Sequence, residues 1–254
     1  MTPIRPDWVY PENIRNDVTN RVGVYDAYRR YADGSAPNLI GAHAIIDDTY
    51  ARLYAENLAL HLASLHLPDK GTVLDIGSGP GTVTAALAAA QMTPTYGIDI
   101  DDMIVGAAAS RYRSCKFIAG SADDLSTFSA NSLRLIHARE FYPFSRAADP
   151  ALHLRFLKAA ASKLVDGGLF VVVQIVDKAG LHNTIVEVRE GARELGYRES
   201  GCDIMVPQRA FRRFGKIVHL GFVYPLIANL GRLLEMIRPG LITYIYWFRC
   251  TKTG

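Results

Sequence analysis

Glycines and acids between residues 73 and 81 could form a binding site for a small charged ligand. The stretch VLDIGSGPG places Asp75, Gly77, Gly79 and Gly81 directly after a short apolar run. Glycine lets the chain turn sharply and brings bare backbone against a ligand, because no Cβ intrudes. A helix that follows such a turn offers free N–H groups and a partial positive charge, which suit a carboxylate. This spacing favours ligand binding, although a tight structural turn would also use glycines.

Two more polar positions follow apolar runs further along the chain. Asp99 lies near the end of PTYGIDI, where a carboxylate could accept hydrogen bonds from both hydroxyls of a ribose. The run CKFIAG ends at Gly120 and leads into Ser121, Ala122 and Asp123. The backbone and side chains there could contact the edge of an adenine. Together these positions predict a site for a ligand that contains a nucleoside.

The loop HAREFYPF, 137–144, carries side chains that could act on a second substrate. His137 is the side chain best matched to proton transfer at neutral pH, and Glu140 could orient it or hold an amine. Arg139 and Tyr142 are the other polar candidates. A hydrogen-bonded role within a strand is the alternative for His137, and ion pairing is the alternative for Glu140.

The elements that must position these residues alternate between strand and helix from residue 72 onward. Short apolar or aromatic runs predict strands at 72–77, 94–100, 115–120, 133–140, 169–176 and 241–248. Helical runs lie between them, including one at about 150–164, and this alternation implies βαβ units. The predicted fold is α/β, a three-layer, doubly wound, mostly parallel sheet. Ligands of such sheets bind at the carboxyl ends of the strands, so the polar positions should converge there.

Two further segments surround the predicted sheet. Residues 1–70 predict an N-terminal helical cap, with helices at about 12–31 and 43–66. Residues 71–254 then form the ligand-binding domain. Within it, 178–238 lies between the fifth strand and the last and is the natural place for an insertion that sets substrate specificity.

The spacing DxGxGxG after the first strand resembles motif I of class I S-adenosylmethionine-dependent methyltransferases of the small-molecule type. A nicotinamide dinucleotide site would instead show GxGxxG, with its last glycine at the position of Thr82. The resemblance extends over 72–176 and includes LVDGGLFVVV at 164–173. It implies a seven-stranded Rossmann-like sheet with S-adenosylmethionine as the cofactor.

By position, the resemblance assigns cofactor contacts to several turns. The turn from Asp75 to Gly81, with Ser78, would hold the methionine end, and Arg139 would contact the same part. The ribose and adenine would be held by Asp99, Ile100, Met103, Ser121, Ala122 and Asp123. The family often has aspartate where Ser121 stands, so Asp123 or a backbone amide would carry more of that contact.

The run GVYDAYRRY, 23–31, resembles the tyrosine-bearing lid that closes over the cofactor in small-molecule methyltransferases. Tyr25 and Tyr28 would be the lid residues. A tyrosine stripe at helical spacing can also pack in a core, which is the alternative interpretation.

The expected reaction is methyl transfer to an oxygen or nitrogen atom of a small-molecule acceptor, with His137, Glu140 and Tyr142 as catalytic residues. The loop lacks the Asn/Asp-Pro-Pro-Tyr of nucleobase and glutamine amino methyltransferases, and it lacks the cysteine of the cytosine-C5 type. Two other functions stay open at this point. One is a nicotinamide-dependent oxidoreductase, and the other is a non-catalytic protein that binds S-adenosylmethionine.

Composition and charge narrow the partners. A formal net charge of +3 without a lysine- or arginine-rich run does not favour nucleic acid. The 3 cysteines form no CxxC pair, so no metal site is expected, and reduced thiols predict a cytoplasmic protein. No signal peptide is evident, and the apolar stretch 217–230 is too short to span a bilayer. The oligomeric state stays open, a homodimer included.

Overall fold

The computed structural model describes residues 48–91, 93–146, 148–174, 179–205 and 243–252, together with Val223, Leu226, Asn229, Leu230 and Leu233. Tyr25, Tyr28 and the helix expected at 12–31 lie outside the described residues. Within the described ranges, no helix has the length and apolar character needed to cross a bilayer.

Seven strands form one sheet in the order β3-β2-β1-β4-β5-β7-β6. They are β1 (Thr72–Ile76), β2 (Thr95–Asp99), β3 (Lys116–Ala119), β4 (Leu133–Arg139), β5 (Leu164–Gln174), β6 (Tyr197–Met205) and β7 (Thr243–Cys250). The strands β1 to β5 pair in parallel, whereas β7 is antiparallel to both β5 and β6. The predicted mostly parallel, doubly wound sheet is confirmed. Strand order reverses between β1 and β4, which form the topological switch point.

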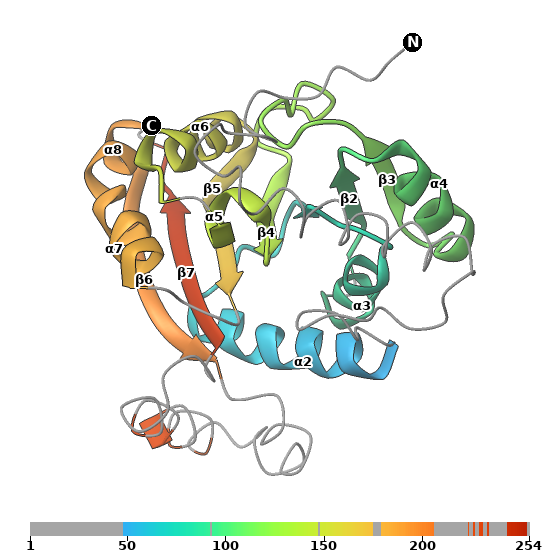
Figure 1. Ribbon diagram of the computed structural model, residues 1–254, viewed down its shortest axis with the longest axis horizontal. Coiled ribbons are helices and arrows are strands. Elements are labelled where there is room, and N and C mark those ends of the chain that lie inside the picture. The colour runs from blue at the N-terminus through green and yellow to red at the C-terminus, as the bar shows by residue number, and fades with distance from the viewer. Residues whose placement is uncertain are drawn as a thin grey trace.

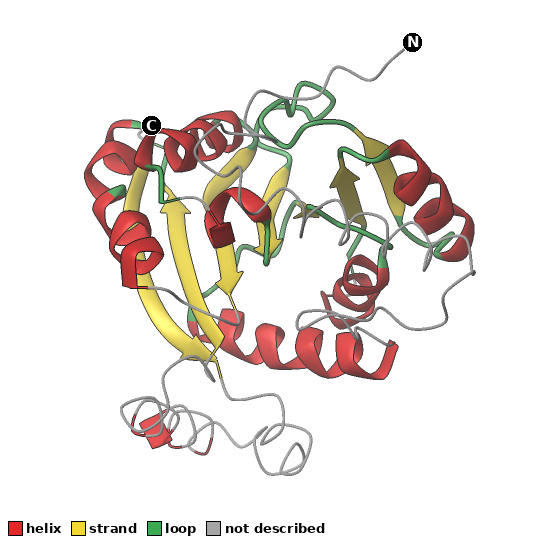
Figure 2. Cartoon of the chain, viewed as in Figure 1, coloured by secondary structure: helices red, strands yellow, loops and turns green. Residues whose placement is uncertain are grey.

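Helices flank the sheet (Figure 2). They are α2 (Asp48–Ser64), α3 (Thr82–Gln91), α4 (Asp102–Arg111), α5 (Tyr142–Arg146), α6 (Pro150–Ala161), α7 (Ala179–Glu187) and α8 (Arg189–Glu194). Local sequence explains where two of them begin. The Asp101 carboxylate accepts the amides of Met103 and Ile104 at the start of α4, and Asp149 caps α6 directly before Pro150.

Two buried apolar clusters lie on the two faces of the sheet, because neighbouring strand residues point to opposite sides. Val73 of β1 belongs to the same cluster as Leu58 of α2 and Leu87 of α3. Leu74 belongs to the other cluster, which includes Phe156 of α6 and residues of α5, α7 and α8. The helix α2 is therefore part of the domain core, beside α3 (Figure 1).

Four described elements lie within the two segments expected to surround the sheet. The segment 178–238, expected to be a specificity insertion, begins with α7, α8 and β6, which complete the layers of the domain. The sequence does not indicate β6, because YRESGCDIM is an edge strand with polar and charged residues in its first half. A specificity insertion in the rest of that segment, 206–238, stays a prediction. The helix α2 lies within the expected cap 1–70 but packs in the core, and a cap formed by the residues before Asp48 also stays a prediction.

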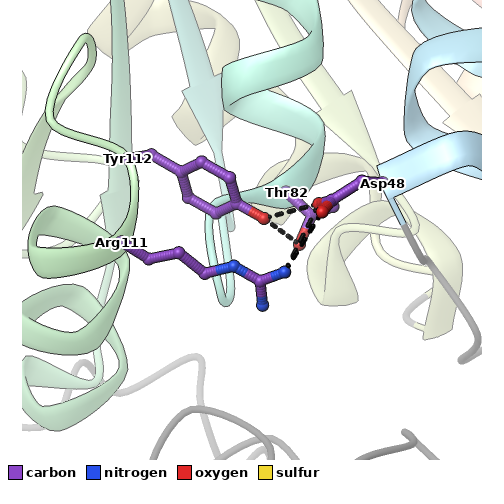
Figure 3. Close-up of polar contacts among 4 residues, drawn as sticks. All are labelled: Asp48, Thr82, Arg111 and Tyr112. Atoms are coloured by element: carbon purple, nitrogen blue, oxygen red, sulfur yellow. Dashed lines mark hydrogen bonds and ion pairs between the residues drawn. The ribbon is translucent and has the colours of Figure 1, made fainter.

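The start of α2 is tied to α3 and α4 by polar side chains (Figure 3). Asp48 accepts a hydrogen bond from the Tyr112 hydroxyl at 2.8 Å and pairs with Nη2 of Arg111 at 3.3 Å. The same hydroxyl lies 3.3 Å from Oγ1 of Thr82, the first residue of α3. Burial raises the pKa of Tyr112 to about 12, so this hydroxyl stays protonated at neutral pH. These contacts hold α2 beside the turn that leads into α3.

Candidate active site

The turn after β1 has a backbone that glycine adopts most easily. Gly77, Gly79 and Gly81 have φ angles of +68°, +51° and +81°. The amides of Gly77 and Ser78 donate to the Ile98 carbonyl of β2, at 2.9 and 3.1 Å. The turn is therefore a fixed backbone surface at the carboxyl end of β1, without side-chain bulk at three of its positions.

The carboxylate of Asp99, at the end of β2, is held by the amides of two turns. Its Oδ2 accepts from Gly79 at 2.9 Å, and its Oδ1 accepts from Asp101 at 3.1 Å. Burial raises the pKa of Asp99, and these two hydrogen bonds act in the opposite direction. Nearby, Ile100 packs against the core, whereas Met103 in α4 is 62% exposed. The structure thus joins Asp99 directly to the glycine turn.

The turn after β3 is held by a paired carboxylate. Oδ1 of Asp123 accepts a hydrogen bond from the Ser121 hydroxyl, and Oδ2 lies 2.6 Å from Nε of Arg155 in α6. Between them, Ala122 is buried in the core. Each oxygen of Asp123 therefore has a partner within the protein, and this pairing orients the turn at the carboxyl end of β3.

A buried chain of hydrogen bonds links β1, β4, α2 and α3. Nδ1 of His137 lies 2.7 Å from Oδ1 of Asp75, and Nε2 lies 2.7 Å from the Tyr54 hydroxyl. The Thr84 hydroxyl donates to Oδ2 of Asp75 at 2.6 Å. His137 is 0% exposed. This geometry argues against the general-base role expected for His137, because neither ring nitrogen is left to face an acceptor.

Two buried polar atoms at the carboxyl ends of β1 and β4 have no hydrogen-bond partner among the described residues. They are Oγ of Ser78 and Nε of Arg139. The guanidinium of Arg139 lies over the rings of Tyr54 and Tyr50, 5.1 and 5.7 Å from their centroids. A buried polar atom without a partner costs about 1–3 kcal/mol, so a ligand that supplies acceptors here is favoured. The two atoms fit a ligand that carries a carboxylate.

Glu140 follows β4 in a backbone conformation that is strained for a residue with a side chain. Its φ angle is +47°, in the left-handed region. Its amide donates to the Val173 carbonyl at 2.9 Å, and its carbonyl accepts from the Ser145 hydroxyl at 3.3 Å. Strain of this kind costs about 1–3 kcal/mol and concentrates at functional sites. Tyr142 begins α5 two residues later, and its side chain lies outside the described part of the structure.

Comparison with protein families matches this site to a known domain. Residues 73–168 match a family described as a methyltransferase domain. The matched range contains the glycine turn, Asp99 and the end of β4, and it stops within β5. Residues 73–168 thus form a methyltransferase domain within the seven-stranded sheet. Its cofactor is therefore S-adenosylmethionine, and the nicotinamide-dependent alternative is set aside. No match was found among the curated proteins.

Solved structures share the fold of this methyltransferase at low sequence identity. A SAM-dependent methyltransferase from Archaeoglobus fulgidus is 15% identical with a TM-score of 0.50, over 78% of this chain and 94% of that one. Phosphoethanolamine N-methyltransferase 2 from Haemonchus contortus, in complex with phosphomonomethylethanolamine and S-adenosylhomocysteine, is 14% identical with a TM-score of 0.50. That match covers 79% of this chain and 53% of that one. At such identities the likeness concerns the fold alone.

Some residues that contact the predicted site residues were not singled out from the sequence. Among them are Tyr54 in α2, Thr84 in α3 and Arg155 in α6. No spacing or motif marks them. Their contacts depend on how helices dock against the carboxyl ends of the strands, which a local pattern does not encode.

Proposed function

We propose that this methyltransferase transfers the methyl group to an oxygen or nitrogen atom of a small-molecule acceptor. The observation that carries the proposal is Glu140, an acid held in a strained backbone just beyond β4, a strand of the switch point. A hydroxyl or a protonated amine must lose a proton for the new bond to form, and a carboxylate at this place can receive it. The formal net charge of +3, without a basic run, favours a small acceptor over nucleic acid.

We infer that the cofactor binds at the carboxyl ends of β1 to β4. The turn from Asp75 to Gly81 would hold its methionine end, with the Ser78 hydroxyl and the Arg139 guanidinium as partners for polar atoms there. Contacts to the ribose and adenine are proposed for Asp99, Ile100, Met103, Ser121, Ala122 and Asp123. S-adenosylmethionine supplies a methyl group that its positively charged sulfur already activates. Positioning of the acceptor can therefore supply much of the rate.

Of the three residues predicted to be catalytic, Glu140 is proposed as the proton acceptor. Tyr142 stays a prediction for a second acceptor contact. His137 is not proposed to touch the acceptor, because Tyr54 and Asp75 occupy both of its ring nitrogens.

The proposal for Glu140 is tested by following release of S-adenosylhomocysteine with panels of small amines and hydroxyl compounds. The Glu140→Gln variant should lose turnover by about 10²- to 10⁴-fold, the usual scale of general-base assistance, with unchanged cofactor affinity. Glu199→Gln is the matched control, because Glu199 is 62% exposed on β6 and pairs with Arg249. Wild-type turnover by Glu140→Gln would contradict the role of this acid. If the wild type methylated none of these compounds, the proposed acceptor class would be wrong.

Tyr25 and Tyr28 are proposed to close over the cofactor. S-adenosylhomocysteine should then slow backbone hydrogen exchange in the segment that contains them. The helix α8, packed in the core on the other face of the sheet, is the internal control and should change little. Equal exchange of the tyrosine segment in both states would contradict the lid.

A further inference from the structure

The strands β1 and β4 carry a polar pair on the face of the sheet that α2 and α3 cover. Asp75 and His137 are register partners in these neighbouring strands. Two residues earlier in each strand, on the same face, Val73 and Leu135 pack in the apolar core. Asp75 and His137 therefore take the place of apolar side chains in the layer next to the glycine turn.

With Tyr54 as the donor, the hydrogen bonds of this pair run in one direction, toward Asp75. Burial raises the pKa of Tyr54 well above its usual value, so its phenol is neutral and can donate to Nε2 of His137. Nδ1 of His137 then carries the ring proton and donates to Oδ1 of Asp75, while the Thr84 hydroxyl donates to Oδ2. The carboxylate thus receives two side-chain donors, and α2 supports one of them.

Tyr54 also contacts the next residue of β4 on the same face. Its ring lies under the guanidinium of Arg139, at 5.1 Å. One side chain of α2 therefore supports both His137, through its hydroxyl, and Arg139, through its ring. A buried polar network of this kind is costly unless its members are paired, and when paired it holds them in one geometry.

We propose that Tyr54 is a positioning residue for the glycine turn. Tyr54 acts through His137 to hold Asp75 in place for cofactor binding. The proposal rests on the proposed function, because it takes the turn from Asp75 to hold the methionine end of S-adenosylmethionine. Asp75 stands two residues before Gly77, so a change in its side-chain position alters how the turn begins. The docking of α2 is then coupled to the affinity for the cofactor.

The Tyr54→Phe variant tests this coupling, because it removes one oxygen atom and keeps the ring under Arg139. Affinity for S-adenosylhomocysteine, measured by calorimetry, should fall roughly tenfold, since Nε2 of His137 is left buried without its donor. Tyr197→Phe is the matched control. Tyr197 is equally buried, and its hydroxyl donates to the Leu157 carbonyl at 2.7 Å, on the face covered by α6. This control should lower thermal stability and leave the affinity unchanged.

A double-mutant cycle separates positioning from general loss of stability. In His137→Asn the amide can still donate to Asp75 but is too short to reach Tyr54. Adding Tyr54→Phe to His137→Asn should therefore weaken S-adenosylhomocysteine binding no further. Additive losses of affinity would mean that Tyr54 does not act through His137, and they would overturn the proposal. Should Tyr54→Phe fail to fold, His137→Asn alone tests the link from Tyr54 to Asp75, because it removes the contact with Tyr54. The same loss of affinity is expected.

Amide chemical shifts of the ligand-free protein provide a readout that needs no cofactor. Tyr54→Phe should move the amide signals of Gly77 and Gly79, whereas Tyr197→Phe should not. If the wild type failed to bind S-adenosylhomocysteine, the proposed cofactor contacts would be wrong, and the positioning proposal that rests on them would be wrong too. If the wild type bound it and Tyr54→Phe behaved as Tyr197→Phe does, only the positioning role would fall.

Discussion

The amide of Gly79 donates to Oδ2 of Asp99 at 2.9 Å, so the turn after β1 and the acid after β2 form one unit. The second oxygen of Asp99 accepts the amide of Asp101, whose own side chain begins α4. Both groups expected to contact the cofactor are thereby held in place within the protein itself. Ordering them on binding then costs little conformational entropy.

Removing the charge of Asp99 should weaken cofactor binding. In Asp99→Ala the ribose would lose a charged acceptor, a loss of about 1.5–3 kcal/mol. Calorimetric titration with S-adenosylhomocysteine measures the change. Asp102→Ala is the control, because Asp102 is a nearby exposed acid in the first turn of α4. An unchanged affinity in Asp99→Ala would remove Asp99 from the site.

Cofactor affinity should also depend on pH through Asp99, whose pKa is raised by burial. The carboxylate accepts ribose hydroxyls best when it is ionised, so affinity should fall as the pH drops through its raised pKa, above the ordinary value of about 3.9. For folding the sign is opposite. The folded protein holds this proton more tightly than the unfolded chain, so the contribution of Asp99 to the free energy of unfolding declines as the pH rises. In Asp99→Asn this part of the pH dependence of binding should vanish, and its persistence would assign it to another group.

Gly79 should not tolerate a branched side chain. Its φ angle of +51° lies in the region that valine avoids, and its amide must reach Asp99. We expect Gly79→Val to fold and to bind little S-adenosylhomocysteine. Gly106→Val is the control, because a Cβ at Gly106, within α4, meets no atom within 4 Å. Normal binding by Gly79→Val would mean that the turn has only a structural role.

The sheet and the turns at its edge could be predicted because their signals are local. The apolar runs ending near Ile76 and Asp99 indicate buried parallel strands, and each polar residue after a run must lie at the same edge. The environment of His137 could not be predicted in this way. Its sequence position is compatible with an exposed base, and only the register of β4 against β1 places it beside Asp75. The strand β6 was missed because an edge strand needs fewer apolar residues.

The strain at Glu140 gives a prediction that separates function from folding. Glycine adopts a φ angle of +47° without steric strain, which offsets its greater loss of conformational freedom on folding, so Glu140→Gly should fold with a thermal midpoint close to that of the wild type. Turnover should nevertheless fall by about 10²-fold or more, because the proposed proton acceptor is gone. His66→Gly is the matched control, since His66 is an exposed residue in the turn after α2 with a φ angle of +51°. It should match Glu140→Gly in stability and the wild type in turnover. If Glu140→Gly kept full turnover, the strained backbone would have only a structural role in the turn, and another group would have to accept the proton.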